Sequence, residues 1–324
     1  MIRGRSTPRR VTRRLTTIML VVGALVLPFG PAVAQAKPSQ PVRMDQEASR
    51  IRTKVVPPKG QTKVTPKAAP GPGAVSSRAF HGRFKGLQLN LCNGGEAACY
   101  QGGLAAGEGH AMINLVDPDA VTLNEICSAD LFDRLVESMA YVWPNDYVAA
   151  AFMPAQVASG GTYIPYKCRN GDDFGNGVLM HIPVDEYYGF EASGWRYGAQ
   201  DAGTEKRTAA CGYALYHFYL CATHLSARDS AVAMSQCAAL TQSIIPQLRA
   251  ESGFAGPAII GGDFNLKYPG PPNVQNCVPP GYTRKGDSAV QHFIVSNAIQ
   301  FVSASRLGMQ YTDHPALIAE LNRP

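Results

Sequence analysis

Six short strings in this chain place side chains that bind metal ions or move protons at the ends of apolar runs. They read Leu-Gln-Leu-Asn at 87–90, Leu-Asn-Glu at 123–125, Gly-Asn-Gly at 175–177, Thr-His-Leu at 223–225, Gly-Gly-Asp-Phe-Asn at 261–265 and Thr-Asp-His at 312–314. Short apolar runs are typical of buried strands, and the ends of neighbouring strands deliver side chains into a shared crevice. The sequence therefore predicts one site built from several strand ends.

The residue types in these strings fit phosphoester hydrolysis assisted by a divalent cation. Mg2+ is usually held by one or two carboxylates plus an amide or phosphate oxygen, so Glu125, Asp313 and Asn90 are a sufficient ligand set. Cleavage also needs a group that activates water and groups that donate to the phosphoryl oxygens. The candidates for these roles are His224, Asp263, Asn265, His314 and Asn176. The candidates that bind the substrate are Asn90, Asn176 and Gln291.

These residues also have purely structural interpretations. Asp263 and Asn265 follow an apolar run at 258–260 and are residue types that favour turns. Asn90 ends an alternating strand whose other face is three leucines, which leaves Gln88 to face solvent. A lone histidine is more often a solvated or core side chain than a catalytic group.

Taken in order and with their gaps, the six strings resemble the endonuclease/exonuclease/phosphatase superfamily, which includes deoxyribonuclease I and bacterial sphingomyelinases. The resemblance covers roughly residues 80–322, and its most specific parts are 262–265 and 313–314. It implies an α/β (α+β) fold, a four-layer sandwich of two packed mixed β-sheets flanked by helices. It also implies one divalent metal ion, Mg2+ or Mn2+, as the cofactor.

The resemblance suggests metal and water-orienting roles for five residues. Glu125 is similar to the principal metal ligand, and Asn90 to the amide beside the metal and the scissile phosphate. Asp263 and Asn265 resemble the pair that orients the attacking water and the phosphoryl group. Asp313 resembles the second acidic residue near the metal.

It also suggests roles for two histidines and one further amide. His314 resembles the histidine that contacts the phosphate and takes part in proton transfer, and His224 resembles a general acid or phosphate contact. Asn176 matches the amide of a Gly-Asn-Ala string, although Gly177 stands where alanine is usual.

One position departs from the family's pattern. Members carry an aspartate at the start of the next-to-last strand, where it supports the terminal histidine, whereas this chain has Gln291. A glutamine can accept a hydrogen bond from His314, but it cannot stabilise an imidazolium by charge. We therefore expect a weakened or specialised activity, or a lost one. Asp287 would compensate if its loop folded back.

Residues 1–36 have the layout of a secretory signal peptide. Six arginines precede an apolar stretch at 18–27, and small residues at 32–36 suit cleavage. Because the apolar stretch is too short to span a bilayer as a helix, we expect a cleaved leader and a secreted protein with no transmembrane segment in its mature form. An uncleaved anchor is the alternative.

Residues 37–79 are rich in Pro, Lys, Ala and Gly, a composition typical of an extended or disordered linker. They carry nine basic and two acidic side chains, whereas residues 80–324, the expected catalytic domain, carry 15 and 22. The linker either holds the enzyme near a polyanion or surface or acts as a solvated tether. Within the acidic domain, Arg169, Arg228 and Arg284 can supply local positive charge.

The eight cysteines all lie between 92 and 277, and an even number in an exported protein predicts disulfides. Many connectivities are possible. The spacing suggests sequential pairing, with free thiols as the alternative: Cys92 with Cys99, Cys127 with Cys168, Cys211 with Cys221, and Cys237 with Cys277.

Strand-like runs lie at 86–91, 120–125, 178–182, 213–223, 257–261, 292–296 and 316–321. Helix-like stretches follow Ser128, a candidate cap, and span 230–250. An aromatic-rich stretch at 185–203 can stack on bases, enter a lipid interface or simply pack as a loop.

These patterns predict a secreted, monomeric, metal-dependent phosphoester hydrolase, with a phosphodiesterase or endonuclease acting on nucleic acid favoured. A sphingomyelinase, a phospholipase C-like enzyme or a small-phosphoester phosphatase would use the same site. A non-catalytic binding module that retains the fold is the remaining alternative, and Gln291 is its motivation.

Overall fold

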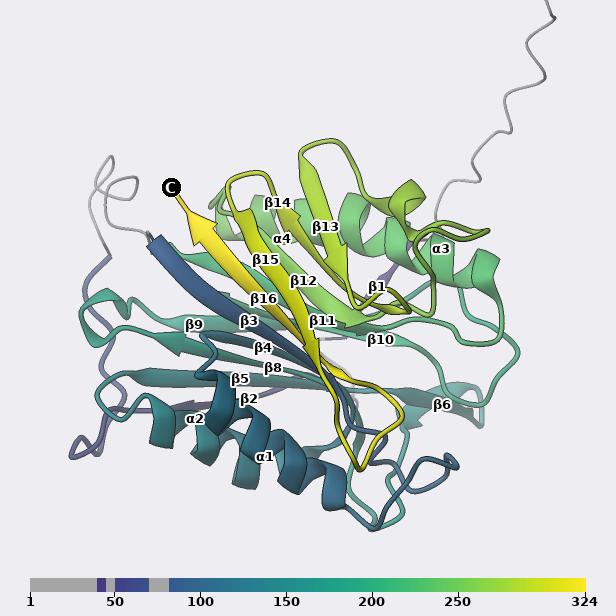
Figure 1. Cartoon of the computed structure of the whole chain (residues 1–324), viewed down its shortest axis with the longest axis horizontal. Coiled ribbons are helices and arrows are strands. Elements are labelled where there is room, and N and C mark those ends of the chain that lie inside the picture. Colours follow the sequence, from purple (N-terminus) through teal and green to yellow (C-terminus); the bar gives the residue numbers. More distant parts are fainter. Residues whose placement is uncertain (1–39, 45–49, 70–81) are drawn as a thin grey trace, which may run out of the picture. The chain divides into compact units, whose positions relative to one another are not determined.

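The computed structural model describes residues 40–44, 50–69 and 82–324. Its main features are two seven-stranded mixed sheets that pack face to face (Figure 1). The predicted signal peptide, residues 1–36, lies outside the described residues.

The first sheet has the order β1-β9-β10-β11-β12-β14-β13. Within it β11 and β12 run parallel, and the other neighbours pair antiparallel. The strands are β1 (Val42–Arg43), β9 (Phe190–Arg196), β10 (Thr208–Ala214), β11 (Phe218–His224), β12 (Ala258–Asp263), β13 (Tyr282–Gly286) and β14 (Gln291–Ser296).

The second sheet has the order β15-β16-β3-β4-β8-β5-β2, and only β3 and β4 run parallel. Its strands are β2 (Arg52–Val56), β3 (Gly82–Asn90), β4 (Ala120–Cys127), β5 (Tyr147–Pro154), β8 (Phe174–Ile182), β15 (Gln300–Leu307) and β16 (Ala316–Arg323). A separate hairpin consists of β6 (Gln156–Ser159) and β7 (Thr162–Pro165).

Helices cover the outer face of each sheet, on opposite sides of the sandwich in Figure 1. On the second sheet lie α1 (Leu104–Val116) and α2 (Val136–Val142), the latter preceded by a π-helical segment, Asp130–Leu135. On the first lie α3 (Ser230–Ala239) and α4 (Ile245–Ser252), joined by a π-helical segment, Leu240–Ile244. Short 3-10 turns span Val184–Glu186 and Val274–Cys277. The predicted four-layer α+β sandwich is confirmed.

Strand alternation explains how the sandwich sorts its side chains. On β3, Leu87 and Leu89 pack toward α1 and α2, while Gln88 and Asn90 point between the two sheets. The prediction that Gln88 faces solvent is wrong because the first sheet covers that face and leaves Gln88 fully buried. Polar groups therefore lie inside the sandwich, where they must be hydrogen-bonded.

Several predicted elements differ in detail. The run at 213–223 is a hairpin rather than one strand, because the chain turns at Leu215–His217 with Tyr216 at φ 68°. No glycine or proline marks this turn. The helix predicted after Ser128 begins without a side-chain cap, whereas Asp229 caps α3 by accepting from the backbone N–H groups of Ala231 and Val232.

The folded unit includes part of the segment predicted as a linker. β1 pairs with β9, and β2 pairs with β5 along the edge of the second sheet. Beyond β2, the backbone N–H of Lys59 donates to Pro144 O at 2.7 Å. The prediction of an extended or disordered linker over 37–79 is therefore wrong for residues 42–43 and 52–59, which belong to the folded unit.

The predicted sequential disulfides are confirmed. The pairs are Cys92–Cys99, Cys127–Cys168, Cys211–Cys221 and Cys237–Cys277. One closes the loop after β3, a second joins the end of β4 to the segment after β7, and a third links β10 to β11. Cross-links of this kind restrict the unfolded chain and hold loops in place.

The aromatic-rich stretch at 185–203 is largely packed. Trp195 and Tyr197 are each 1% exposed and belong to the core under α3 and α4. These rings are thus packed, as one interpretation predicts, but Trp195 lies on β9 rather than in a loop. None of the helices in the described residues is long and apolar enough to cross a membrane.

Candidate active site

A cleft of about 500 Å³ lies where β11 and β12 of the first sheet and β4 of the second end. Its lining includes five of the residues predicted from the sequence: Glu125, His224, Asp263, Asn265 and His314. The parallel pairing of β11 with β12 sets His224 beside Asp263. Strand ends thus converge as the six strings predict.

Asp263 is the most enclosed carboxylate of the cleft, with 2% exposure. Its Oδ1 accepts from the backbone N–H of Asn265 at 2.9 Å, and its Oδ2 accepts from Asn90 Nδ2 at 3.1 Å. The same Oδ2 lies 3.4 Å from His314 Nε2. Burial raises the pKa of Asp263, and the nearby His314 acts in the opposite direction.

Glu125 reaches the cleft because β4 bulges. The pairing of β4 with β8 shifts register between Leu123 and Ile126, and Glu125 takes a positive φ of 51°. This conformation is costly for a non-glycine residue, and it turns the carboxylate out of the ladder. Burial is the main cause that raises the pKa of Glu125 to about 7, and the nearby carboxylates of Glu205 and Asp263 add to it.

His224 is buried at the end of β11. Its Nε2 lies 3.9 Å from both Glu125 Oε1 and Asp263 Oδ2. Burial, with Arg207 as the next cause, lowers the pKa of His224 well below its usual value. This imidazole is therefore neutral near pH 7, when it can donate one hydrogen bond to a ligand.

Three of the predicted site residues lie behind the lining of the cleft. Asn90 is fully buried, donates to Glu125 at 3.1 Å, and uses its oxygen to accept from the backbone N–H of Cys92. The Asn176 amide donates to Thr208 O and accepts from Asn124. Gln291 donates to Pro315 O at 2.6 Å. These amides make hydrogen bonds behind the residues that line the cleft.

Two expectations about His314 are not met in the described residues. The hydrogen bonds of Gln291 join it to Gln88, Pro315 and Asp287, not to His314. Asp287 uses Oδ1 on the backbone N–H groups of Ala289 and Gln291, so it does not supply the missing carboxylate. The carboxylates close to His314 are those of Asp263 and, at 3.6 Å, Asp313.

Asn124 is a buried residue that the sequence analysis overlooks. Its oxygen accepts from the backbone N–H of Asp263 at 2.7 Å and from Gln88 at 2.8 Å. Its nitrogen donates to Asn176 Oδ1 and to Thr223 O, both at 2.8 Å. All four hydrogen bonds of the amide are made, and they tie β4 to both strands that carry His224 and Asp263.

Arg207 is a second overlooked residue, and it lines the cleft just before β10. Its Nη1 donates to Glu205 Oε1 at 2.7 Å. Of the arginines expected to supply positive charge, Arg228 also lines the cleft. Arg284 instead lies over the Tyr268 ring and donates to His292. In the sequence, Arg207 is marked only by its position two residues after Glu205.

The donor set beside Asp263 fits a hard cation. Glu125 offers a carboxylate whose ionised form is destabilised by burial, a state that a bound cation would relieve. Asp313 is more open, with a side chain 60% exposed, and it is not among the residues that line the cleft. A geometric cluster of Cys92, Cys99 and Asp313 is no metal site, since both sulfurs are in a disulfide.

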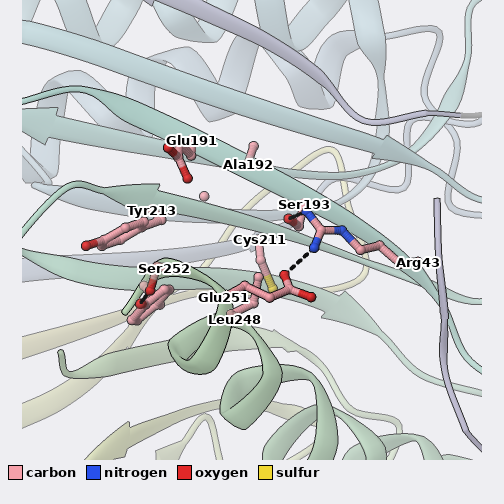
Figure 2. Close-up of a pocket in the computed structure, with 11 residues that line it drawn as sticks. Arg43, Glu191, Ala192, Ser193, Cys211, Tyr213, Leu248, Glu251 and Ser252 are labelled. Carbon is pink, nitrogen blue, oxygen red and sulfur yellow. Dashed lines mark hydrogen bonds and ion pairs between the residues drawn. The ribbon is translucent and has the colours of Figure 1, made fainter. Parts of the chain in front are cut away.

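A smaller cavity of about 200 Å³ lies on the outer face of the first sheet, against α4 (Figure 2). Arg43 spans it, pairing with Glu251 and donating to Ser193 Oγ at 3.2 Å. The Cys211 sulfur, held in a disulfide, lines its wall. None of the predicted site residues borders this cavity, so the cleft is the candidate active site.

Comparison with known proteins identifies one family by its sequence model and a shared fold among solved structures. A model described as "Endonuclease/Exonuclease/phosphatase family" matches residues 108–313. The human nocturnin catalytic domain with bound sulfate is 15% identical, with 75% of this chain and 94% of that chain covered and a TM-score of 0.52. An endonuclease/exonuclease/phosphatase from Beutenbergia cavernae is 14% identical, with 75% and 72% covered and a TM-score of 0.52. No curated protein sequence matches the chain.

Proposed function

The chain belongs to the endonuclease/exonuclease/phosphatase family, as the order of its motifs predicts, and we propose on this premise that it is a divalent-metal-dependent phosphodiesterase. The observation that carries the proposal is the meeting of Glu125, Asp263 and His314 in one cleft. Asp263 and His314 are in contact at 3.4 Å, and Asn90 bridges Asp263 to Glu125.

In this proposal Asp263 and Asn265 orient the attacking water. The Oδ2 atom of Asp263 lies toward His314 and the cleft, whereas Oδ1 is held by the Asn265 backbone. A fixed carboxylate of this kind can accept a proton from water in a defined direction. Neutral His224 donates to a phosphoryl oxygen, and His314 contacts the phosphate and takes part in proton transfer.

The cation would be held by Glu125, with Asp313 and Asn90 nearby, and we propose Mg2+ or Mn2+ because the donors are oxygens. When bound, such a cation polarises the phosphoryl group and stabilises the charge that develops on it. Asn90 and Asn176 are proposed to position the ligands and the strand ends, together with Gln291, rather than to contact substrate directly.

Nucleic acid is the substrate class that we favour. Arg207 and Arg228 are supporting features, because both line the cleft and guanidinium groups bind phosphates well. A lipid substrate is the less favoured alternative, since Trp195 and Tyr197 are buried and unavailable for a membrane. A small-phosphoester phosphatase would fit the same cleft. A non-catalytic module is motivated by Gln291 alone.

We also propose that the protein is secreted and acts as a monomer. Four disulfides support an oxidising compartment. A contact with a polyanion is proposed for the segment at 50–69, which holds six basic residues and no acidic one.

The test is hydrolysis by purified residues 37–324 with Mg2+ or Mn2+, and with a chelator. The substrates are a dinucleotide with one diester, plasmid DNA and sphingomyelin vesicles, and His314→Ala is the control. Metal-dependent cleavage of a nucleotide substrate, lost in the control, is the expected result. Cleavage of the vesicles alone would move the assignment to a lipid phosphodiesterase, and no cleavage of any diester would leave a phosphatase or a binding module.

A further inference from the structure

The cleft opens beside Glu125 into a side pocket of about 90 Å³. This side pocket is acidic and aromatic. Besides Glu125, its lining includes Glu96, Tyr166, Phe174 and Glu205. Because Glu96, Tyr166 and Glu205 also line the main cleft, a substrate bound at Glu125 lies beside this wall.

The wall of the side pocket is held rigidly. Glu96 lies within the loop closed by Cys92–Cys99, and it accepts a hydrogen bond from the Tyr166 hydroxyl. The segment after Tyr166 is fastened by Cys127–Cys168, and the backbone N–H of Arg169 donates to Gly94 O at 2.8 Å. The Tyr166 hydroxyl therefore directs the Glu96 carboxylate toward the side pocket.

Glu205 lies in the bend before β10, where Arg207 donates a hydrogen bond to its carboxylate. The backbone of Arg207 is clamped by Gln200, whose amide accepts from its N–H at 2.7 Å and donates to its C=O at 2.9 Å. Arg207 offsets the charge of Glu205. Among the described residues no cation pairs with Glu96, so the wall keeps a negative charge.

The main cleft as a whole also carries an excess of negatively charged side-chain types. Five carboxylates and two arginines line it, so acidic side chains outnumber basic ones. A polynucleotide carries a phosphate at every nucleotide, and proteins that bind it along its length neutralise these phosphates with Lys and Arg. A second phosphate lying against Glu96 and Glu205 would be repelled in a partly enclosed space.

We propose that Glu96 and Glu205 are specificity-determining residues, which restrict the enzyme to phosphodiesters that carry no second phosphate on the side-pocket side of the scissile bond. The substrates are then dinucleotides, chain ends and other small diesters rather than the internal bonds of a polynucleotide. This inference rests on the proposed phosphodiesterase function, and it names the substrates of that same cleft.

The experiment compares three dinucleotides with the same internal diester: one without terminal phosphates, one with a 5′-phosphate and one with a 3′-phosphate. With Mg2+ or Mn2+, we expect one phosphorylated form to show kcat/KM at least about tenfold below the unphosphorylated form. Glu96→Gln and the double variant with Glu205→Gln should reduce that ratio. Glutamine at 205 can still accept from Arg207, so the clamp is kept.

The matched control is Glu191→Gln, a carboxylate outside the cleft, which should leave the ratio unchanged. Because Glu96 is exposed, its single variant tests the inference even if the double variant folds poorly. Equal rates on all three dinucleotides, or a ratio unmoved by Glu96→Gln, would overturn the inference while leaving the phosphodiesterase proposal intact. No hydrolysis of any dinucleotide would instead reject the proposed function.

Discussion

The Asp263 carboxylate and the His314 imidazole meet at 3.4 Å although they come from different sheets. Asp263 ends β12, and His314 lies on the segment that leads into β16. The contact therefore exists only when the two sheets are packed. Both side chains line the cleft, so the pair faces a bound substrate together.

Removing either side chain should abolish most of the activity. We expect Asp263→Asn and His314→Ala each to lower kcat by about 10²–10⁴, the range for positioned acid–base groups. The double variant should lose much less than the product of the two effects, because the residues act as a unit. Steady-state kinetics on the dinucleotide measure this, and His110→Ala, an exposed histidine on α1, is the control. Multiplicative losses would show that the pair does not act together.

Metal binding should depend on pH through Glu125. Its pKa is raised to about 7, so below that pH a cation must displace a proton from the carboxylate. The apparent affinity for Mg2+ or Mn2+ should therefore rise by up to about tenfold per pH unit below pH 7 and level off above it. Calorimetric titration between pH 5.5 and about 8.5 checks this. Glu125→Gln should remove both the tight binding and its slope, and a slope that survives in this variant would assign the proton elsewhere.

His292 should make the fold sensitive to acid. It is fully buried, accepts from Arg284 at Nδ1 and donates to Leu266 O, and burial lowers its pKa to about 4. Since the unfolded chain binds the proton near pH 6.5, the stability from neutral His292 is present above that pH and is lost as pH falls toward 4. The loss approaches about 3 kcal/mol.

Urea unfolding at pH 7 and at pH 4.5 measures the loss, with His292→Asn as the comparison. The variant is expected to be less stable at pH 7 but to lose less on acidification. The raised pKa values of Glu125 and Asp263 act in the opposite direction in both proteins, so the difference between the two slopes isolates His292. Equal slopes would mean that His292 is not the acid-sensitive group.

Asn124 should matter for folding as well as for catalysis. Asn124→Leu has a similar size but removes four buried hydrogen bonds, including the one that Asn176 Oδ1 accepts. We expect a loss of about 3 kcal/mol or more in the free energy of unfolding, because each orphaned buried group costs about 1–3 kcal/mol. Denaturant titration measures it, and the exposed Asn297→Leu should be nearly neutral.

The contrast between Glu125 and Asn124 shows what a sequence can predict here. Glu125, His224 and Asp263 end apolar runs, and the pattern marks such positions directly. Asn124 has partners on four other strands, so its importance depends on how the two sheets pack, which no local pattern encodes. The turn at Tyr216 was missed for a related reason, since it forms in an apolar run without glycine or proline.

Position 291 separates a weakened enzyme from a binding module. Gln291 is fully buried, pairs with Asp263 in the β12–β14 register and donates to Pro315 O, next to His314. Gln291→Asp would bring a negative charge toward the His314 imidazolium that forms during proton transfer. We expect kcat to rise by about two- to tenfold, within the effect of one modest charge interaction.

The same substitution should cost stability. Aspartate cannot donate to Pro315 O, and it adds a buried charge beside Asp263, so we expect a loss of about 1–3 kcal/mol. Gln291→Asn, which is equally short but neutral, is the matched control, and kcat is measured well below the melting temperature of each variant. If aspartate and asparagine give the same nonzero rate, charge at position 291 does not act on His314. If neither variant nor the wild type turns over any phosphodiester, a phosphatase or a binding module remains, and the amide at 291 alone does not account for the missing activity.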